Sequence, residues 1–178
     1  PEGDIDPPTG HMRFPGTLTI SEETFEDILV STAKSLLQHG FSRVYFIGDS
    51  GSTQRGQTAA ADRMRSGWWS SAPAQVFQIS DYYFPEANGQ IAELQEQGFS
   101  LEQIGTHAGI RDTSEVMALK ADGVRALNTA VPGVLNATGE IGVIGEPSLA
   151  SADIGRVMLD LKVQAALAQI RALPQPGL

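Results

Sequence analysis

The stretch Phe41–Gln54, with the sequence FSRVYFIGDSGSTQ, constrains the fold of this 178-residue chain more than any other segment. Its apolar run, Val44–Ile47, predicts a buried β-strand, and a glycine-containing turn separates that strand from a helix beginning at about Gln57. Ligands of open α/β sheets bind at the carboxyl ends of the strands, where glycine lets backbone N–H groups approach closely. The turn therefore predicts a binding site. Its polar side chains belong to Asp49, Ser50, Ser52 and Thr53.

The rest of the chain alternates between strand-like and helix-like segments. The strand-like segments are 16–20, 44–47, 75–79 and 141–144, and the helix-like segments are 22–38, 57–65, 91–97, 113–119 and 151–173, with a short capped turn at 101–104. Proline and glycine give residues 1–15 the character of an extended N-terminal segment. This alternation predicts one α/β domain over residues 1–178, with a mainly parallel sheet.

Composition excludes several classes of function. The net charge is −9 and no cluster of Lys and Arg exists, which argues against a nucleic-acid surface. No apolar run is long enough to predict a membrane span. The absence of cysteine excludes disulfides, thiolate metal sites and a Cys nucleophile. We expect a soluble protein of the cytoplasm or the periplasm; because the chain begins with Pro1, a processed product or a fragment fits equally well.

Candidate chemistry centres on His107, which lies in a polar, glycine-flanked loop. That setting favours a functional histidine over a core one. Asp112 follows near a helix start, where it is either a functional carboxylate or a simple helix cap. Trp68 and Trp69 are large apolar groups in a loop, and they predict either a lid over a small ligand or an oligomer contact.

Four sequence blocks resemble the creatininase family, and they occur in the family's order. They are FPGT at 14–17, VYFIGDSGST at 44–53, THAGIRDTS at 106–114 and GEPSLASADIGR at 145–156. The resemblance implies a three-layer α/β/α domain, hydrolysis of a small, often cyclic amide, and a homo-oligomer that is often a hexamer. It also implies two divalent metals, such as Zn or Mn, which polarise the amide carbonyl and activate a water.

Carried over residue by residue, the resemblance implies an altered site. A metal-binding His of the family's turn is matched by Ser50, and a Glu ligand of some members by Ser52. His107 matches the His that assists proton transfer to the leaving nitrogen, and Asp112 matches an acidic position of the same block. Serine is a poor ligand beside imidazole or carboxylate, so Asp49 is the candidate substitute.

The other family ligands precede the FPGT block. Only thirteen residues precede Phe14 here, and they contain no Glu-x-His, so we expect the family's first strand-helix unit to be missing from this chain. An uncovered sheet edge would then favour association of subunits. The metal site is expected to be altered or incomplete.

Three functions remain open. The first is an amidohydrolase with an altered metal site, and the second is a non-catalytic subunit for assembly or ligand binding. The third is a serine hydrolase in which Ser50, His107 and Asp112 act together. All catalytic versions require that the Asp49–Ser52 turn and the His107–Asp112 loop share one cavity.

Overall fold

The computed structural model describes residues 1–66, 75–125 and 142–174. The helices and strands are α1 (Glu22–Gln38), β1 (Val44–Phe46), α2 (Gly51–Arg65), β2 (Val76–Gln78), α3 (Gln90–Glu96), α4 (Leu101–Ile104), α5 (Ile110–Leu119) and α6 (Ala152–Ala172). Four 3₁₀ turns accompany them, at Gly10–Arg13, Ser80–Tyr82, Ala121–Gly123 and Pro147–Leu149. None of the helices in these ranges is both long and apolar enough to cross a bilayer.

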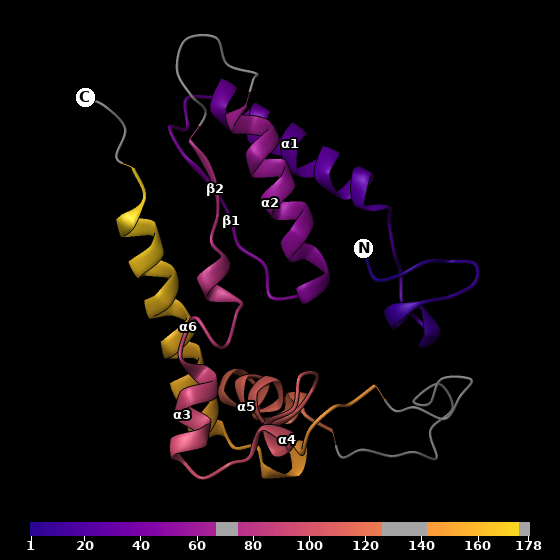
Figure 1. Ribbon diagram of the computed structural model, residues 1–178, viewed down its shortest axis with the longest axis vertical. Coiled ribbons are helices and arrows are strands. Elements are labelled where there is room, and N and C mark those ends of the chain that lie inside the picture. Colours follow the sequence, from indigo (N-terminus) through magenta and orange to yellow (C-terminus); the bar gives the residue numbers. More distant parts are fainter. Residues whose placement is uncertain (67–74, 126–141, 175–178) are drawn as a thin grey trace.

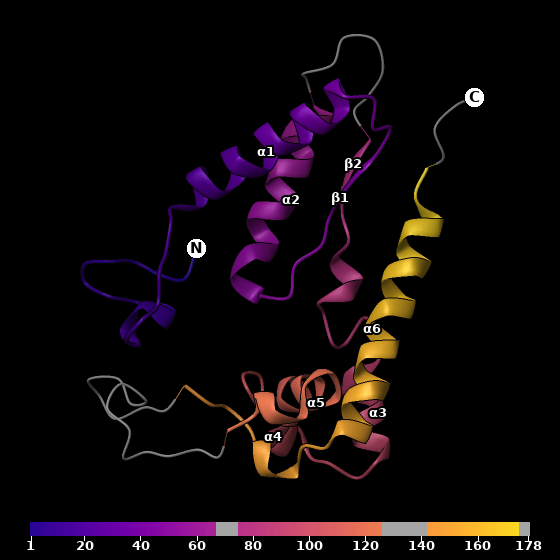
Figure 2. The ribbon, with the colours of Figure 1, turned by 180° about the vertical axis from the view of Figure 1, so that it is seen from behind.

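The elements form two halves joined by α6 (Figure 1). One half contains α1, α2, β1 and β2, and the other contains α3, α4 and α5. The C-terminal helix α6 runs from the second half to the side of β2, as the reverse view also shows (Figure 2). Its apolar face therefore packs against both halves, covering α5 at one end and β2 and the turn after it at the other.

The first half is built around two short parallel strands. β1 pairs with β2 in the register Val44 to Val76, and α2 is the crossover between them. Helix α1 packs on α2, and small side chains on the facing surfaces allow close approach. The buried core of this half consists of Val30, Ala33, Val44, Phe46, Ala60, Ala61, Met64 and Val76.

The second half packs α5 against α6. Its buried core consists of Leu94, Ile104, Ile110 and Met158. At the crossing of the two helices, Gly155 lies against the backbone of Ser114, and a Cβ atom at Gly155 would lie 1.8 Å from the Ser114 carbonyl oxygen. The absence of a side chain at Gly155 is thus what allows this helix spacing.

The two strands are parallel, as predicted, but the sheet is smaller than the prediction. Within the described ranges the sheet has two strands of three residues each, and helices dominate. The predicted strand at 16–20 is irregular chain, with Leu18 88% exposed, because no strand of the described residues pairs with it. Near 141–144, Ile144 forms a single antiparallel bridge with His107.

Candidate active-site cleft

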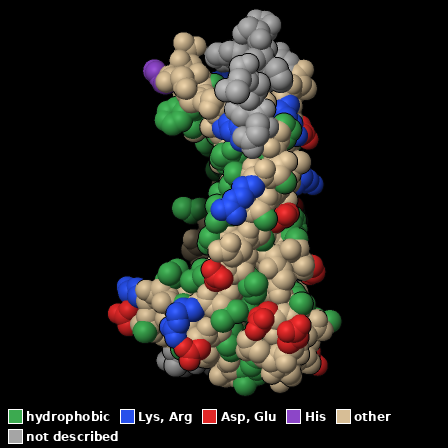
Figure 3. All heavy atoms as spheres, turned by 90° about the vertical axis from the view of Figure 1, so that its left-hand side faces the viewer, with side chains coloured by type: hydrophobic (Ala, Val, Ile, Leu, Met, Phe, Trp, Pro, Cys, Tyr) green, Lys and Arg blue, Asp and Glu red, His purple; other side chains and the backbone are tan. Residues whose placement is uncertain are grey.

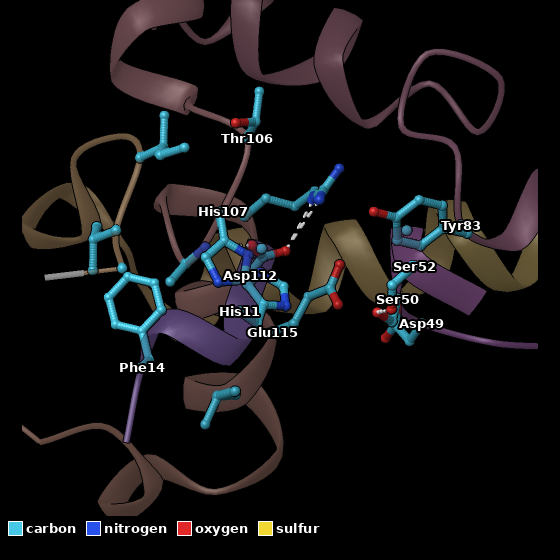
Figure 4. Close-up of a pocket in the computed structure, with 18 of the residues that line it drawn as sticks. His11, Phe14, Asp49, Ser50, Ser52, Tyr83, Thr106, His107, Asp112 and Glu115 are labelled. Atoms are coloured by element: carbon cyan, nitrogen blue, oxygen red, sulfur yellow. Dashed lines mark hydrogen bonds and ion pairs between the residues drawn. The ribbon is translucent and has the colours of Figure 1, made fainter. Parts of the chain in front are cut away.

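A cleft of about 1140 Å³ lies between the two halves. The turn after β1 contributes Asp49, Ser50 and Ser52 to its wall, and the loop and first turns of α5 contribute His107 and Asp112 (Figure 4). The two segments that were expected to share a cavity therefore do so. Trp68 and Trp69 lie outside the described residues.

A chain of hydrogen bonds joins the Ser50 hydroxyl to Ser52 and Glu2, and no hydrogen bond among the described residues joins it directly to a histidine. Ser52 Oγ donates to Glu2 Oε1 over 2.8 Å, and Ser50 Oγ lies 2.9 Å from Ser52 Oγ. Because the Ser52 proton goes to a carboxylate, which only accepts, Ser50 is the donor to Ser52. Gln54 Nε2 fixes the turn by donating to the carbonyl oxygens of Gly48 and Ser50.

The N-terminal segment supplies two residues that sequence reasoning missed. Glu2 Oε2 lies 2.5 Å from His11 Nδ1, and His11 lines the cleft. Burial raises the pKa of Glu2, but hydrogen bonds from His11 and Ser52 outweigh it, so the pKa falls below its ordinary value. Since an ionised carboxylate only accepts, His11 Nδ1 carries the proton of this hydrogen bond, which makes Nε2 the basic nitrogen of the neutral imidazole. Glu2 and Ser52 are fifty positions apart in the sequence, and no sequence motif connects them.

The imidazoles of His11 and His107 stack on one another. Their ring centroids are 4.8 Å apart at an interplanar angle of 27°. The backbone of His107 is held from both sides, because its N–H donates to Ile144 O and its carbonyl accepts from Ile144 N–H. The structure thus places two histidines from distant parts of the chain at one side of the cleft (Figure 4).

Asp112 shapes the loop that carries His107. Its Oδ2 accepts from the Ala108 N–H over 2.8 Å, and its Oδ1 accepts from Arg111. Ala108 has a φ of 50°, a left-handed conformation that is uncommon for residues other than glycine. Asp112 therefore stabilises a strained backbone position next to His107. The interpretation of Asp112 as a simple helix cap was wrong, because α5 begins at Ile110 with Gly109 as its N-cap. Among the described contacts of Asp112, none is to the imidazole.

A buried lysine joins the two halves at the floor of the site. Lys162 Nζ lies 2.8 and 3.0 Å from the two Asp49 carboxylate oxygens and 2.8 Å from Glu115 Oε2. Burial lowers the pKa of Lys162, but its hydrogen bonds with Asp49 and Glu115 raise it more, so the ammonium is charged at neutral pH. Gln90 Nε2 donates to the second Glu115 oxygen over 2.7 Å.

The sequence contained a signal for this lysine. The buried residues of α6 are Gly155, Met158, Lys162 and Ala166, which recur at helical spacing. A lysine on such a buried stripe requires a charged partner, because an unpaired buried ammonium is very costly. The spacing therefore predicts that Lys162 has a charged partner, but it does not identify which residues are the partners.

The donor set in the described part of the chain does not fit a two-metal centre. No group of three or more His, Cys, Asp or Glu side chains there could hold a metal ion. Ser50 stands where the family resemblance places an imidazole, and a hydroxyl is a poor ligand for zinc-like ions. The hypothesis that Asp49 replaces it meets a physical obstacle, since both Asp49 oxygens bind the Lys162 ammonium.

A cleft with polar side chains at the carboxyl end of two parallel strands is typical of ligand sites in α/β proteins. The family model described as creatinine amidohydrolase matches residues 7–170, so the chain belongs to the creatininase family. No curated protein matches it.

Several solved structures share the fold. A crystal structure of creatinine amidohydrolase is 22% identical with a TM-score of 0.64, and the match covers 92% of this chain and 68% of that one. A structure described as creatininase Mn is 21% identical with a TM-score of 0.63, covering 91% and 68%. A mutant creatininase complexed with creatine is 20% identical with a TM-score of 0.62, covering 98% and 73%. At these identities the likeness establishes the fold.

Proposed function

We propose that this chain hydrolyses the C–N bond of a small, creatinine-like amide bound in the cleft, with His11 and His107 as the groups that transfer protons. The stacked His11–His107 pair carries the proposal, because the two rings face one cleft and Glu2 fixes the tautomer of one of them. Membership of a family of creatinine amidohydrolases supports this reaction class. The structural relative complexed with creatine supports a ligand of this size and polarity.

The two histidines supply the two proton transfers that amide hydrolysis needs. With Nδ1–H bound to Glu2, the remaining basic atom of His11 is Nε2, which can accept a proton from an attacking water. Glu2 then stabilises the imidazolium, as the carboxylate of a catalytic triad does. His107 donates a proton to the leaving nitrogen. Acid–base catalysis of this kind contributes about 10²–10⁴-fold to the rate.

The beginning of α2 suits the negative charge that develops on the amide oxygen. This 15-residue helix starts at Gly51, directly at the cleft wall. Backbone N–H groups at a helix N-terminus and the helix dipole both favour an anion. We therefore assign the α2 N-terminus to oxyanion stabilisation, with no role for the Ser50 hydroxyl as nucleophile.

A histidine series tests the proposal. Purified protein is assayed for amine release or ring opening on a panel of cyclic and linear amides, with and without a chelator. We expect H107A and H11A each to lower kcat/KM by about 10²-fold or more. The matched control is H39A, which removes the remaining histidine at the exposed end of α1.

The outcomes discriminate between the alternatives. Equal activity in H107A and H39A would refute the proton-transfer roles. Activity lost in Ser50→Ala but kept in H11A would restore the serine hydrolase. Activity abolished by chelator and restored by Mn²⁺ or Zn²⁺ would show that metal ligands outside the described residues complete the site.

A second candidate is a non-catalytic subunit that binds a small ligand. The pairing of Asp49 with Lys162 favours it, because this carboxylate already has a cationic partner. In that case calorimetry detects binding of creatinine or creatine while no amide in the panel is turned over.

Oligomerisation remains a prediction, with a homo-hexamer as the size implied by the family. Hydrophobic side chains reach the surface along α6 (Figure 3). The exposed apolar residues of α6 are Val157, Val163 and Leu167. Light scattering coupled to size-exclusion chromatography measures the subunit number, and a monomer would contradict the prediction.

A further inference from the structure

The Lys162 ammonium is surrounded by oxygen atoms much as a bound cation would be. Asp49 and Glu115 contribute three oxygens at 2.8–3.0 Å, and these match the three N–H donors of an ammonium group. Lys162 Nζ also lies 4.7 Å from the centre of the Tyr82 ring, a cation–π distance. The three carboxylate oxygens and the face of the ring thus all favour a positive charge on this nitrogen.

The three residues come from different parts of the fold. Asp49 follows β1, Glu115 lies in α5 and Lys162 lies in α6, so the cation holds the two walls of the cleft together. The Lys162 side chain is 4% exposed and that of Glu115 is 10% exposed, whereas Asp49 is 55% exposed to the cleft. Without the ammonium, Asp49 and Glu115 would lose the cationic partner that they share in the described part of the chain.

We propose that Lys162 is a built-in cation, which occupies the place between Asp49 and Glu115 that a divalent metal would otherwise take. The two carboxylates are therefore unavailable to an added metal, and the lysine supplies the positive charge that holds them in position. This inference concerns how the site is held together, and it does not depend on whether the cleft hydrolyses an amide.

Removal of the lysine side chain should convert the carboxylate pair into a divalent-cation site. Carboxylate oxygens suit Mn²⁺ and Mg²⁺, and the truncated side chain leaves room for an ion with bound water. A lysine that acts merely as one member of an ordinary ion pair would give a different result. Its removal would weaken the fold without creating metal affinity.

Mn²⁺ titration followed by electron paramagnetic resonance tests the proposal. We expect K162A to bind Mn²⁺ about tenfold or more tightly than the wild type. The matched control is K120A, which removes an exposed lysine at the end of α5 and should behave like the wild type. The double variants D49N/K162A and E115Q/K162A should lose the acquired affinity.

Cation rescue provides a second measurement that remains valid if K162A folds poorly. Mn²⁺ or ethylammonium should raise the melting temperature of K162A, or restore its folding, and should have no such effect on D49N/K162A. A K162A protein that neither binds Mn²⁺ more tightly than the wild type nor responds to either cation would overturn the proposal. These readouts do not use enzymatic activity, so a failure of the proposed hydrolase function is seen separately.

Discussion

Replacement of Gly155 by alanine tests the packing that positions the α5 side of the cleft. The new Cβ would lie 1.8 Å from the carbonyl oxygen of Ser114, 2.4 Å from its carbonyl carbon and 2.9 Å from Ala118 Cβ. Since normal contacts exceed 3 Å, α5 and α6 must separate by about 1.5 Å or more. A backbone carbonyl in a helix cannot rotate away, so the helix itself has to move.

The expected magnitude is a balance of two effects. Alanine is favoured over glycine in a helix interior by about 1 kcal/mol. Overpacking of a core costs about 1–3 kcal/mol and occasionally more, and the short distance to backbone atoms places this site at or above the upper end. We therefore expect a net loss of about 2 kcal/mol or more in the free energy of unfolding. For a chain of this length, that corresponds to a fall in melting temperature of about 4–8 °C.

Urea unfolding and calorimetry of G155A measure the loss, and G56A is the matched control. Gly56 is also a buried helical glycine, but a Cβ there would meet the ring of Phe25 at 2.7 Å, and this half-buried side chain can shift. We expect G56A to be clearly less destabilised than G155A. A G155A protein as stable as the wild type would refute the assignment of Gly155 as the residue that sets the α5–α6 spacing.

Three further predictions concern charged groups. The pKa of Glu2 in the folded state lies below 4.5, so the ionised Glu2 stabilises the folded protein above that pH, and this stabilisation is lost as the pH falls. The difference in melting temperature between wild type and E2Q should therefore vanish in acid. The pKa of Lys162 lies above 10.5, so the wild type should lose stability as the pH rises past that value, whereas K162M should lack this loss. D112A removes the hydrogen bond to the Ala108 N–H, so it should cost about 1 kcal/mol in urea unfolding and also lower kcat, with exposed D122A as control. Unchanged stability would contradict the role of Asp112 at Ala108.

The local elements of this fold were predictable from sequence. The predicted helices at 22–38 and 151–173 are α1 and α6, whose N-caps are Ser21 and Ser151. The capped turn predicted at 101–104 is α4, with a capping box at Ser100. Helix α2 begins six residues earlier than predicted, at Gly51, because a polar glycine-containing start carries no apolar periodicity. These features depend on interactions within a few residues, so the sequence determines them.

The family and the placement of the cleft were also determined by sequence. Four blocks in order predict the creatininase family, which the match over residues 7–170 confirms. The turn at the carboxyl end of a buried strand predicts a binding site, and every catalytic hypothesis required the His107–Asp112 loop to share its cavity. Asp49, Ser50, Ser52, His107 and Asp112 do line that cavity.

The tertiary structure decided which of these residues interact. It pairs Asp49 with Lys162 across 113 positions of sequence, and Ser52 with Glu2 across 50. It also stacks His11 on His107 and leaves 16–20 without a strand partner. Such contacts depend on the path of the whole chain, and no local propensity encodes which distant side chain will neutralise a given charge. The chemistry assigned to the cleft therefore follows from partners that become visible only when the chain is folded.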